Sequence, residues 1–366
     1  MGHPDEGDIL VLVKPTPEYQ VQFLISIQRL LTEGQFVATY KYALLLALAD
    51  IAVEFGDDSG DPLPLPTKRI AEKFIEYYWR QTSPYIPRNS PGGVLLQNTG
   101  RQAEVLVHIH EIRNTASSLA EIKRDRRRWA SLVSKVDAVV RNMPLWKLQT
   151  VGRTQLEFLY ENRADAKTIE LKSGVAFCFR QFHGLTNELI RGAWVRFVRK
   201  QNPDLLGTTT DLMDFMFGCE RSNLGLVIPI LKELQNGRCF YCALPMNKSL
   251  QVDHFVAWSR YQVDLGHNLV LAHDTCNSAK ADHIAAREHL HAWVERNVRY
   301  ASELASEFDC NVILHDLPTT MHVTEWAYAQ TEFAGGLTWL RKNELIPLAE
   351  EWRADLKKLD FARMVI

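Results

Sequence analysis

The sequence R-C-F-Y-C-A-L-P occupies residues 238–245, S-L-Q-V-D-H-F occupies 249–255, and G-H-N-L-V-L-A-H-D-T-C-N-S-A-K occupies 266–280. These segments contain a C-x2-C pair and, about thirty residues later, an H-x2-C pair. Such donors at such spacing are typical of a tetrahedral structural zinc site. The sequence therefore predicts that Zn²⁺ is bound by Cys239, Cys242, His273 and Cys276. His267 is an alternative fourth ligand, but the x2 spacing to Cys276 favours His273.

The residues between the two pairs predict two short strands and a helix. Leu250–Val252 alternates apolar and polar side chains, and Asn268–Leu271 is a compact run with β propensity. The polar stretch 259–267 between them is expected to be a loop, and the chain after Cys276 has a helical pattern. The expected unit is strand, loop, strand, helix, with a zinc knuckle holding both ends.

The order D-H, N-L and C-N-x-x-K resembles the HNH endonuclease family, the ββα-metal nucleases, in its zinc-bearing form. Here these motifs are Asp253-His254, Asn268-Leu269 and Cys276-Asn277 through Lys280. The resemblance covers about fifty residues. His273 is a departure, because the family usually has Cys there, although His is also an accepted zinc ligand.

The resemblance implies a role for each residue of the second set. His254 is the implied general base, and Asp253 and Asn277 are the implied oxygen ligands of one catalytic Mg²⁺ or Mn²⁺. Asn268 is the implied orienting residue for the loop and the His254 ring. Lys280 has about equal prospects of contacting phosphate or of being a solvated side chain, and His283 is expected to point away from the site.

The fold class expected is mainly α (α+β). A helical N-terminal domain is expected over 1–143, a mixed linking segment over 144–220, the HNH domain over 221–297 and a helical C-terminal extension over 298–366. The helices expected in the first domain are 22–31, 36–54 and 68–80. Short strands are expected at 144–146, 158–160 and 168–171, one helix at 174–198, and a terminal helix at 340–361 interrupted near Pro347.

Composition places few limits on function. The chain has 366 residues, 46% hydrophobic content and a formal net charge of −2, so any field that attracts nucleic acid must be local. The densest basic run is K-R-D-R-R-R at 123–128, where a solvated helix face and a phosphate-contacting patch formed by Arg126, Arg127 and Arg128 both stay open. Cys178, Cys219 and Cys310 are expected to be buried free thiols in a reducing cytoplasm. The apolar run at 9–13 is too short for a targeting segment, and the apolar helix expected around 42–49 is too short to span a bilayer.

The function expected is hydrolysis of DNA phosphodiester bonds by a metal-dependent endonuclease. By resemblance, such proteins often belong to restriction or phage-defence systems, with a partner protein as one option. Two alternatives stay open at this point. One is a zinc-dependent nucleic-acid-binding module without catalysis, and the other is an HNH-like nuclease that acts on RNA.

Overall fold

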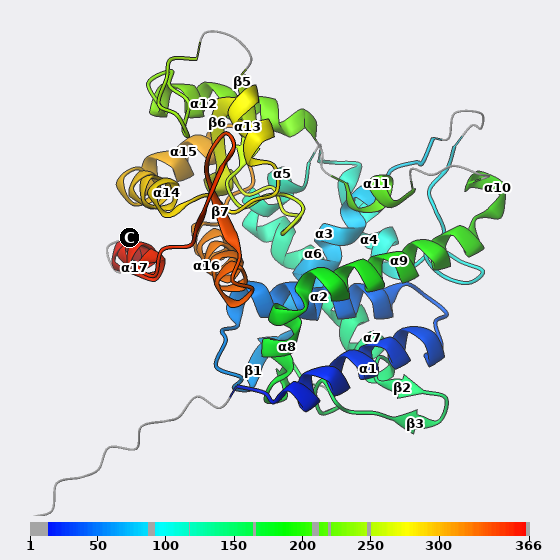
Figure 1. Ribbon diagram of the computed structural model, residues 1–366. Helices are drawn as coiled ribbons and strands as arrows, with labels where there is room; N and C mark the ends of the chain where they lie inside the picture. The colour runs from blue at the N-terminus through cyan, green and yellow to red at the C-terminus, as the bar shows by residue number, and fades with distance from the viewer. Residues whose placement is uncertain are drawn as a thin grey trace, which may run out of the picture.

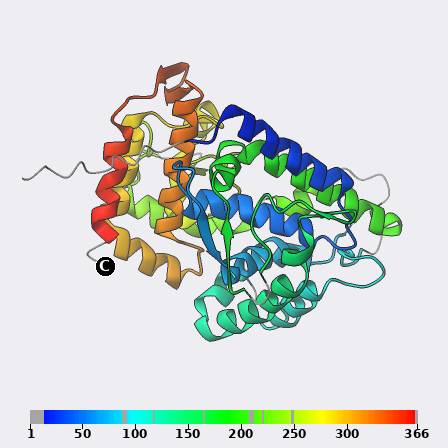
Figure 2. The ribbon, with the colours of Figure 1, turned by 90° about the horizontal axis from the view of Figure 1, so that it is seen from below.

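The computed structural model describes residues 14–86, 92–116, 118–163, 166–206, 212–218, 221–246 and 250–363. The apolar run at 9–13 and Cys219 lie outside these ranges. Cys178 is buried as expected, whereas Cys310 is exposed and that expectation was wrong. The chain forms a helical half and a half that contains the zinc knuckle, which lie side by side in two perpendicular views (Figures 1 and 2).

The first half is almost entirely helical. Its helices are α1 (Pro17–Glu33), α2 (Tyr40–Phe55), α3 (Thr67–Gln81), α4 (Glu104–Arg113), α5 (Leu119–Arg124), α6 (Arg126–Asn142), α7 (Pro144–Lys147), α8 (Val175–Gln181), α9 (His183–Gln201), α10 (Pro203–Leu206) and α11 (Leu212–Phe217). Two antiparallel pairs accompany them, β1 (Leu63–Pro66) with β4 (Thr168–Leu171) and β2 (Thr150–Val151) with β3 (Thr154–Gln155).

Helix α2 is the centre of the helical half. Its sequence is apolar around most of its circumference, a pattern that requires burial on all sides. Every residue from Lys41 to Glu54 is buried, and α3, α8, α9 and α16 pack around the helix. The polar residues near its C-terminal end, Asp50 and Glu54, are therefore buried as well and must have partners.

The second half contains two hairpins among helices. Its elements are η1 (Arg221–Leu226), α12 (Val227–Leu234), β5 (Leu250–His254), η2 (Gly266–Asn268), β6 (Leu269–His273), α13 (Asp274–Lys280), α14 (Arg287–Arg299), α15 (Ala301–Cys310), α16 (Leu317–Phe333), β7 (Leu337–Arg341), β8 (Glu344–Pro347) and α17 (Trp352–Arg363). Strands β5 and β6 pair antiparallel, and α13 follows directly, so the expected strand, strand and helix unit is confirmed.

Buried apolar side chains form two clusters. The first extends from Phe23 to Met216, so the predicted segments 1–143 and 144–220 contribute to one core. The second extends from Val227 to Leu356 and also includes Val53 of α2, so it joins the predicted HNH and C-terminal segments. The halves are also linked by a hydrogen bond from Trp326 Nε1 to the Arg180 carbonyl at 2.9 Å.

Several local expectations were wrong. Residues 144–147 form a helix rather than a strand, with Pro144 at the first helical position, where proline is well tolerated. The helix expected over 174–198 is two helices separated at Phe182, which has φ −111° and ψ 23°. The terminal helix begins only at Trp352, because 337–347 forms the β7–β8 hairpin with Asn343 in the left-handed region at φ 61°.

Candidate active site in a zinc-stapled ββα unit

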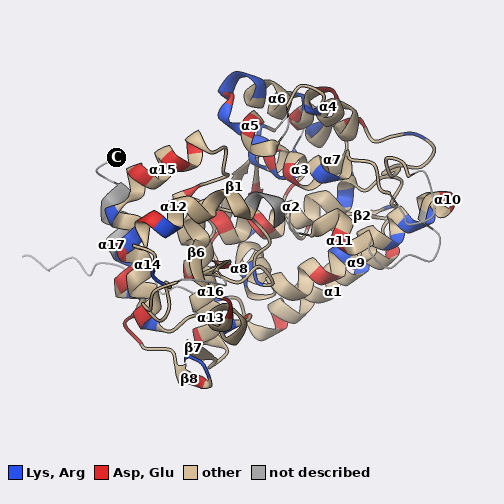
Figure 3. Cartoon of the chain, turned by 90° about the horizontal axis from the view of Figure 1, so that it is seen from above, with Lys and Arg blue, Asp and Glu red and all other residues tan. Residues whose placement is uncertain are grey.

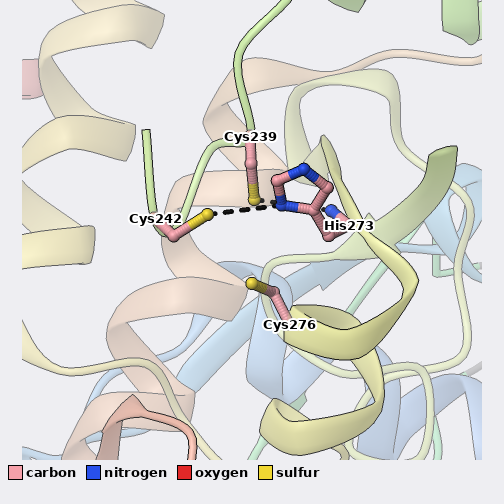
Figure 4. Close-up of side chains that lie close together, drawn as sticks. All are labelled: Cys239, Cys242, His273 and Cys276. Carbon is pink, nitrogen blue, oxygen red and sulfur yellow. Dashed lines mark hydrogen bonds between the residues drawn. The ribbon is translucent and has the colours of Figure 1, made fainter. Parts of the chain in front are cut away.

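The four predicted zinc ligands converge. Their donor atoms all lie within 4.8 Å of one another, and Figure 4 shows the sulfurs and the imidazole of His273 facing a common centre. Cys239 and Cys242 lie in the turn after α12, where Ala243 adopts φ 56°. His273 ends β6, and Cys276 is in the first turn of α13, which follows directly, so the cluster joins two separate pieces of chain.

The chemistry of this donor set fits Zn²⁺. Burial and the neighbouring thiols of Cys239 and Cys242 raise the pKa of Cys276 to about 12, so a cation is needed before all three cysteines can ionise. His273 Nδ1 lies 3.3 Å from Cys242 Sγ, and its Nε2 lies 3.3 Å from the Pro245 carbonyl. A proton on Nε2 donated to that carbonyl leaves the Nδ1 lone pair free for a metal.

His267 is not part of the cluster. Its side chain is 1% exposed and packs edge-on against Phe308, with His315 also in ring contact. Burial, together with the charges of His315 and Arg296, lowers its pKa to about 3. The x2 spacing therefore identified the correct histidine, and His267 is a neutral core residue.

The hairpin register places the motif residues at one end of the unit. Asp253 pairs with Val270 and His254 with Leu269, so both acidic and imidazole side chains lie where β5 ends and β6 begins. Asn268 fixes the turn after His254 through two bonds to Val256. Its Oδ1 accepts from the Val256 amide at 2.8 Å, and its Nδ2 donates to the Val256 carbonyl at 3.0 Å.

Asp253 and Lys280 form a buried ion pair. Lys280 Nζ lies 3.1 Å from Asp253 Oδ2 and donates to the His254 carbonyl at 3.0 Å, and the lysine side chain is 0% exposed. Tyr241 Oη donates to the same Asp253 oxygen at 2.5 Å. Lys280 thus lies inside the unit and not at a surface where it would meet phosphate. Its position stabilises Asp253 and the strand end that bears His254.

Asn277 lies in α13 and is half-buried. Its Nδ2 donates to Gln251 Oε1 at 2.8 Å, which fixes the amide plane against β5. The amide oxygen is the atom of this side chain that a divalent cation would use. His283 follows α13, which ends at Lys280, and is exposed.

Sequence reasoning missed the partner of His254. His254 Nε2 lies 2.6 Å from Asp264 Oδ1, and the His254 ring lies 5.4 Å from that of Trp258. Asp264 is in the irregular stretch between β5 and β6, so strand and helix periodicity gave no signal for it. The cue available in the sequence was an acidic residue close to a motif histidine within a short loop.

The basic run lies on the helical half. Asp125 separates α5 from α6 and caps α6 by accepting from the Arg128 amide at 3.1 Å. Arg126 and Arg127 are exposed, whereas the Arg128 guanidinium donates to Thr115. In Figure 3, the Lys and Arg positions, coloured blue on the ribbon, gather at this α5–α6 turn.

A pocket of about 430 Å³ separates the basic turn from the HNH unit. Its helical wall includes Lys73, Lys123 and Trp129, and its other wall includes Trp258 and Asp264. The charges on the helical wall are paired. Lys73 lies 2.5 Å from Glu54 and 3.0 Å from Glu76, and Lys123 lies 2.6 Å from Glu76.

Comparison with known families defines the class of this unit. Residues 239–283 match the family model described as HNH endonuclease, which covers the zinc ligands, the β5–β6 hairpin and α13. The second half of the chain therefore contains an HNH endonuclease domain, and its Cys3His cluster is compatible with a structural metal ion such as zinc.

The helical half of the chain matches a second family model. Residues 20–212 match the model described as "Domain of unknown function (DUF8808)", and this match covers more than half of the 366 residues. The chain belongs to the DUF8808 family. No curated protein matches it, and within the described ranges no helix is both long enough and apolar enough to cross a membrane.

Proposed function

We propose that this protein is an endonuclease that hydrolyses DNA phosphodiester bonds with one divalent metal ion. The observation that supports this most strongly is His254, which ends β5 inside an HNH domain with its ring bonded to a carboxylate and the following turn held by Asn268. An isolated structural zinc site has no need of this second set of residues.

His254 takes the proton from the attacking water as general base in this proposal. Oxygen Oδ1 of Asp253 and the Asn277 amide oxygen would hold Mg²⁺ or Mn²⁺. When bound, that ion stabilises the negative charge that develops on the phosphate and on the leaving oxygen. Asn268 keeps the His254 backbone in place, and the zinc knuckle fixes α13 against β5.

Two features support a nucleic-acid substrate. The α5–α6 turn offers Arg126, Arg127 and Arg128, and Trp129 of the same region lines the pocket that reaches Trp258 beside His254. Cationic and aromatic side chains along one path suit phosphates and unstacked bases. Because the formal net charge of the chain is −2, the electrostatic support for DNA comes from this local path.

The test is cleavage by the purified protein of supercoiled plasmid, linear duplex, single-stranded DNA and RNA, each with Mg²⁺, with Mn²⁺ and with EDTA. Metal-dependent cutting of DNA is expected. Binding without cutting under every condition would favour the non-catalytic zinc module, and cutting of RNA alone would favour a ribonuclease.

The proposed biological setting is restriction or phage defence in the cytoplasm, together with a partner protein of such a system. The support is the resemblance of the HNH domain and its attachment to a separate helical domain. A plaque assay tests it. Expression of the wild-type protein should lower phage yield, whereas His254→Ala expressed at the same level should not.

A further inference from the structure

The loop between β5 and β6 is held by the helical half of the molecule. Tyr261 Oη donates to Glu54 Oε1 of α2 at 2.5 Å, and the Tyr261 ring stacks on His183 of α9 with centroids 5.7 Å apart. The next residue, Gln262, accepts a hydrogen bond from Arg191 of α9. Two successive loop residues are therefore fixed to buried residues of the DUF8808 region.

Glu54, which accepts the hydrogen bond from Tyr261, is itself held in place by an ion pair. Glu54 also binds Lys73, which is paired with Glu76, and all three side chains are largely buried. Burial alone would lower the pKa of Lys73, but the carboxylates of Glu54 and Glu76 outweigh it and raise that pKa. The lysine stays charged, and the position of Glu54 is maintained by an ion pair that cannot easily rearrange.

Asp264 follows these two fixed residues and reaches back to His254. A carboxylate can only accept, so the 2.6 Å contact requires the proton of the neutral imidazole to be on Nε2. The lone pair is then on Nδ1. The contact thus selects one tautomer and one ring orientation, which is how a carboxylate assists a histidine base in other hydrolases.

We propose that Asp264 is the positioning residue of the nuclease site, and that the helical domain sets its place through Tyr261 and Gln262. This inference rests on the proposed function of His254. It gives the DUF8808 region a part in catalysis, because the loop that orients the base is fixed to α2 and α9. Asp264 itself does not touch the substrate.

A purely stabilising role is the competing explanation. The Asp264 side chain is 25% exposed, and partly exposed ion pairs contribute little to stability. A loss of activity without a loss of fold would therefore point to orientation. The distinction needs a measurement on the ring of His254 as well as a rate.

The experiment compares the full-length wild type with Asp264→Ala and Asp264→Asn. Asp264→Ala should lower kcat by about 10–100-fold with DNA affinity and zinc content unchanged, as removal of an orienting partner does. Asp264→Asn should fall between, since its amide oxygen can still accept. The matched control is Asp309→Asn, which alters another Asp–His pair, with His315, and should leave kcat unchanged.

Two further measurements show whether Asp264 affects kcat through His254. In ¹⁵N-histidine NMR spectra, His254 should show the Nε2–H tautomer in the wild type and a mixture of tautomers in Asp264→Ala. In a His254→Ala background, Asp264→Ala should have no additional effect on the residual rate, since it acts through His254.

Unchanged kcat together with an unchanged His254 tautomer in Asp264→Ala would overturn the inference while the proposed nuclease function stands. A wild-type protein that cuts no nucleic acid would overturn the proposed function and, with it, the catalytic role of Asp264. The tautomer measurement would then still report whether Asp264 orients the ring.

Discussion

Buried charge at single residues decides how the HNH domain holds its motif side chains. Asp253 is 7% exposed and depends on Lys280 and Tyr241, while His267 is nearly inaccessible and neutral. Both arrangements predict measurable changes in the free energy of unfolding.

Lys280→Met should destabilise the HNH domain by about 3–5 kcal/mol, because it leaves Asp253 buried without its cation. Arg29→Met is the control. Arg29 and Glu33 form an exposed pair at 3.3 Å, for which about 0–1 kcal/mol is expected. Urea unfolding measures both, and equal small effects would show that Lys280 is solvated and not paired as described.

His267 should make the protein less stable in mild acid. Its pKa in the folded state is about 3 against 6.5 when unfolded, so the unfolded chain binds the proton first and stability falls as pH drops below 6.5. Between pH 7 and pH 5 this residue accounts for about 2 kcal/mol. In His267→Leu, the free energy of unfolding should fall by about 2 kcal/mol less than in the wild type between pH 7 and pH 5. Urea unfolding at both pH values measures this difference. Parallel pH dependences for the two proteins would refute this.

At the scale of elements, the zinc knuckle adds to the second apolar cluster in holding the β5–β6–α13 unit. The hairpin has five residues in each strand and α13 has seven, and such short elements are not stable alone. Zinc binding supplies apparent stabilisation of about 10–16 kcal/mol in small finger peptides, so it can fix this unit.

Cys276→Ser should therefore reduce zinc from about one atom per chain to far less and unfold residues 238–286. The helical half should remain folded, because its core from Phe23 to Met216 includes none of the ligands. Cys310→Ser, at an exposed cysteine outside the cluster, should change neither property. Elemental analysis with limited proteolysis tests this, and a wild type that is folded but free of zinc would contradict it.

The elements also show where the sequence was informative. The x2 pairs and the D-H, N-L and C-N-x-x-K motifs located the ββα unit, because metal ligands impose strict spacing. The β7–β8 hairpin was not predicted, since its position depends on distant contacts. Trp339 in β7 donates its amide to the Ile284 carbonyl at 2.8 Å, and its own carbonyl accepts from Ala286 at 2.7 Å.

The candidate site also contains some features that the sequence motifs predict and others that depend on distant contacts. The convergence of the four Cys and His donors and the hydrogen bonds of Asn268 to the loop followed from motif positions. The position of Asp264 and the burial of Lys280 did not. Asp264 depends on where a loop is held by α2 and α9, and those contacts join residues more than seventy positions apart. Lys280 is buried because it forms an ion pair with Asp253 and lies over the ring of Tyr241. The helical periodicity of α13 gives no information about these two contacts.

At the scale of the whole molecule, the helical domain and the HNH domain enclose one pocket, and the basic α5–α6 turn borders it. If DNA follows this path, Arg126→Ala, Arg127→Ala and Arg128→Ala combined should weaken binding to all sequences. The slope of log affinity against log salt should become shallower by up to about 3, at roughly 0.9 per phosphate contact.

A control triple variant removes Arg196, Arg199 and Lys200, which are exposed cations of α9. Its salt slope should remain that of the wild type, as measured by fluorescence anisotropy with a labelled duplex. Equal slopes for the wild type and the Arg126–Arg128 variant would mean that the basic turn is a solvated helix face.

The most direct test of the account is the cleavage rate of His254→Ala. Loss of a general base removes about 10²–10⁴-fold of rate, so cutting of plasmid DNA with Mg²⁺ should nearly disappear while zinc content and DNA affinity stay at wild-type values. His283→Ala, at an exposed histidine beyond α13, should cut normally. If His254→Ala retains zinc and cuts at the wild-type rate, His254 is not the base and the assignment of the site is wrong.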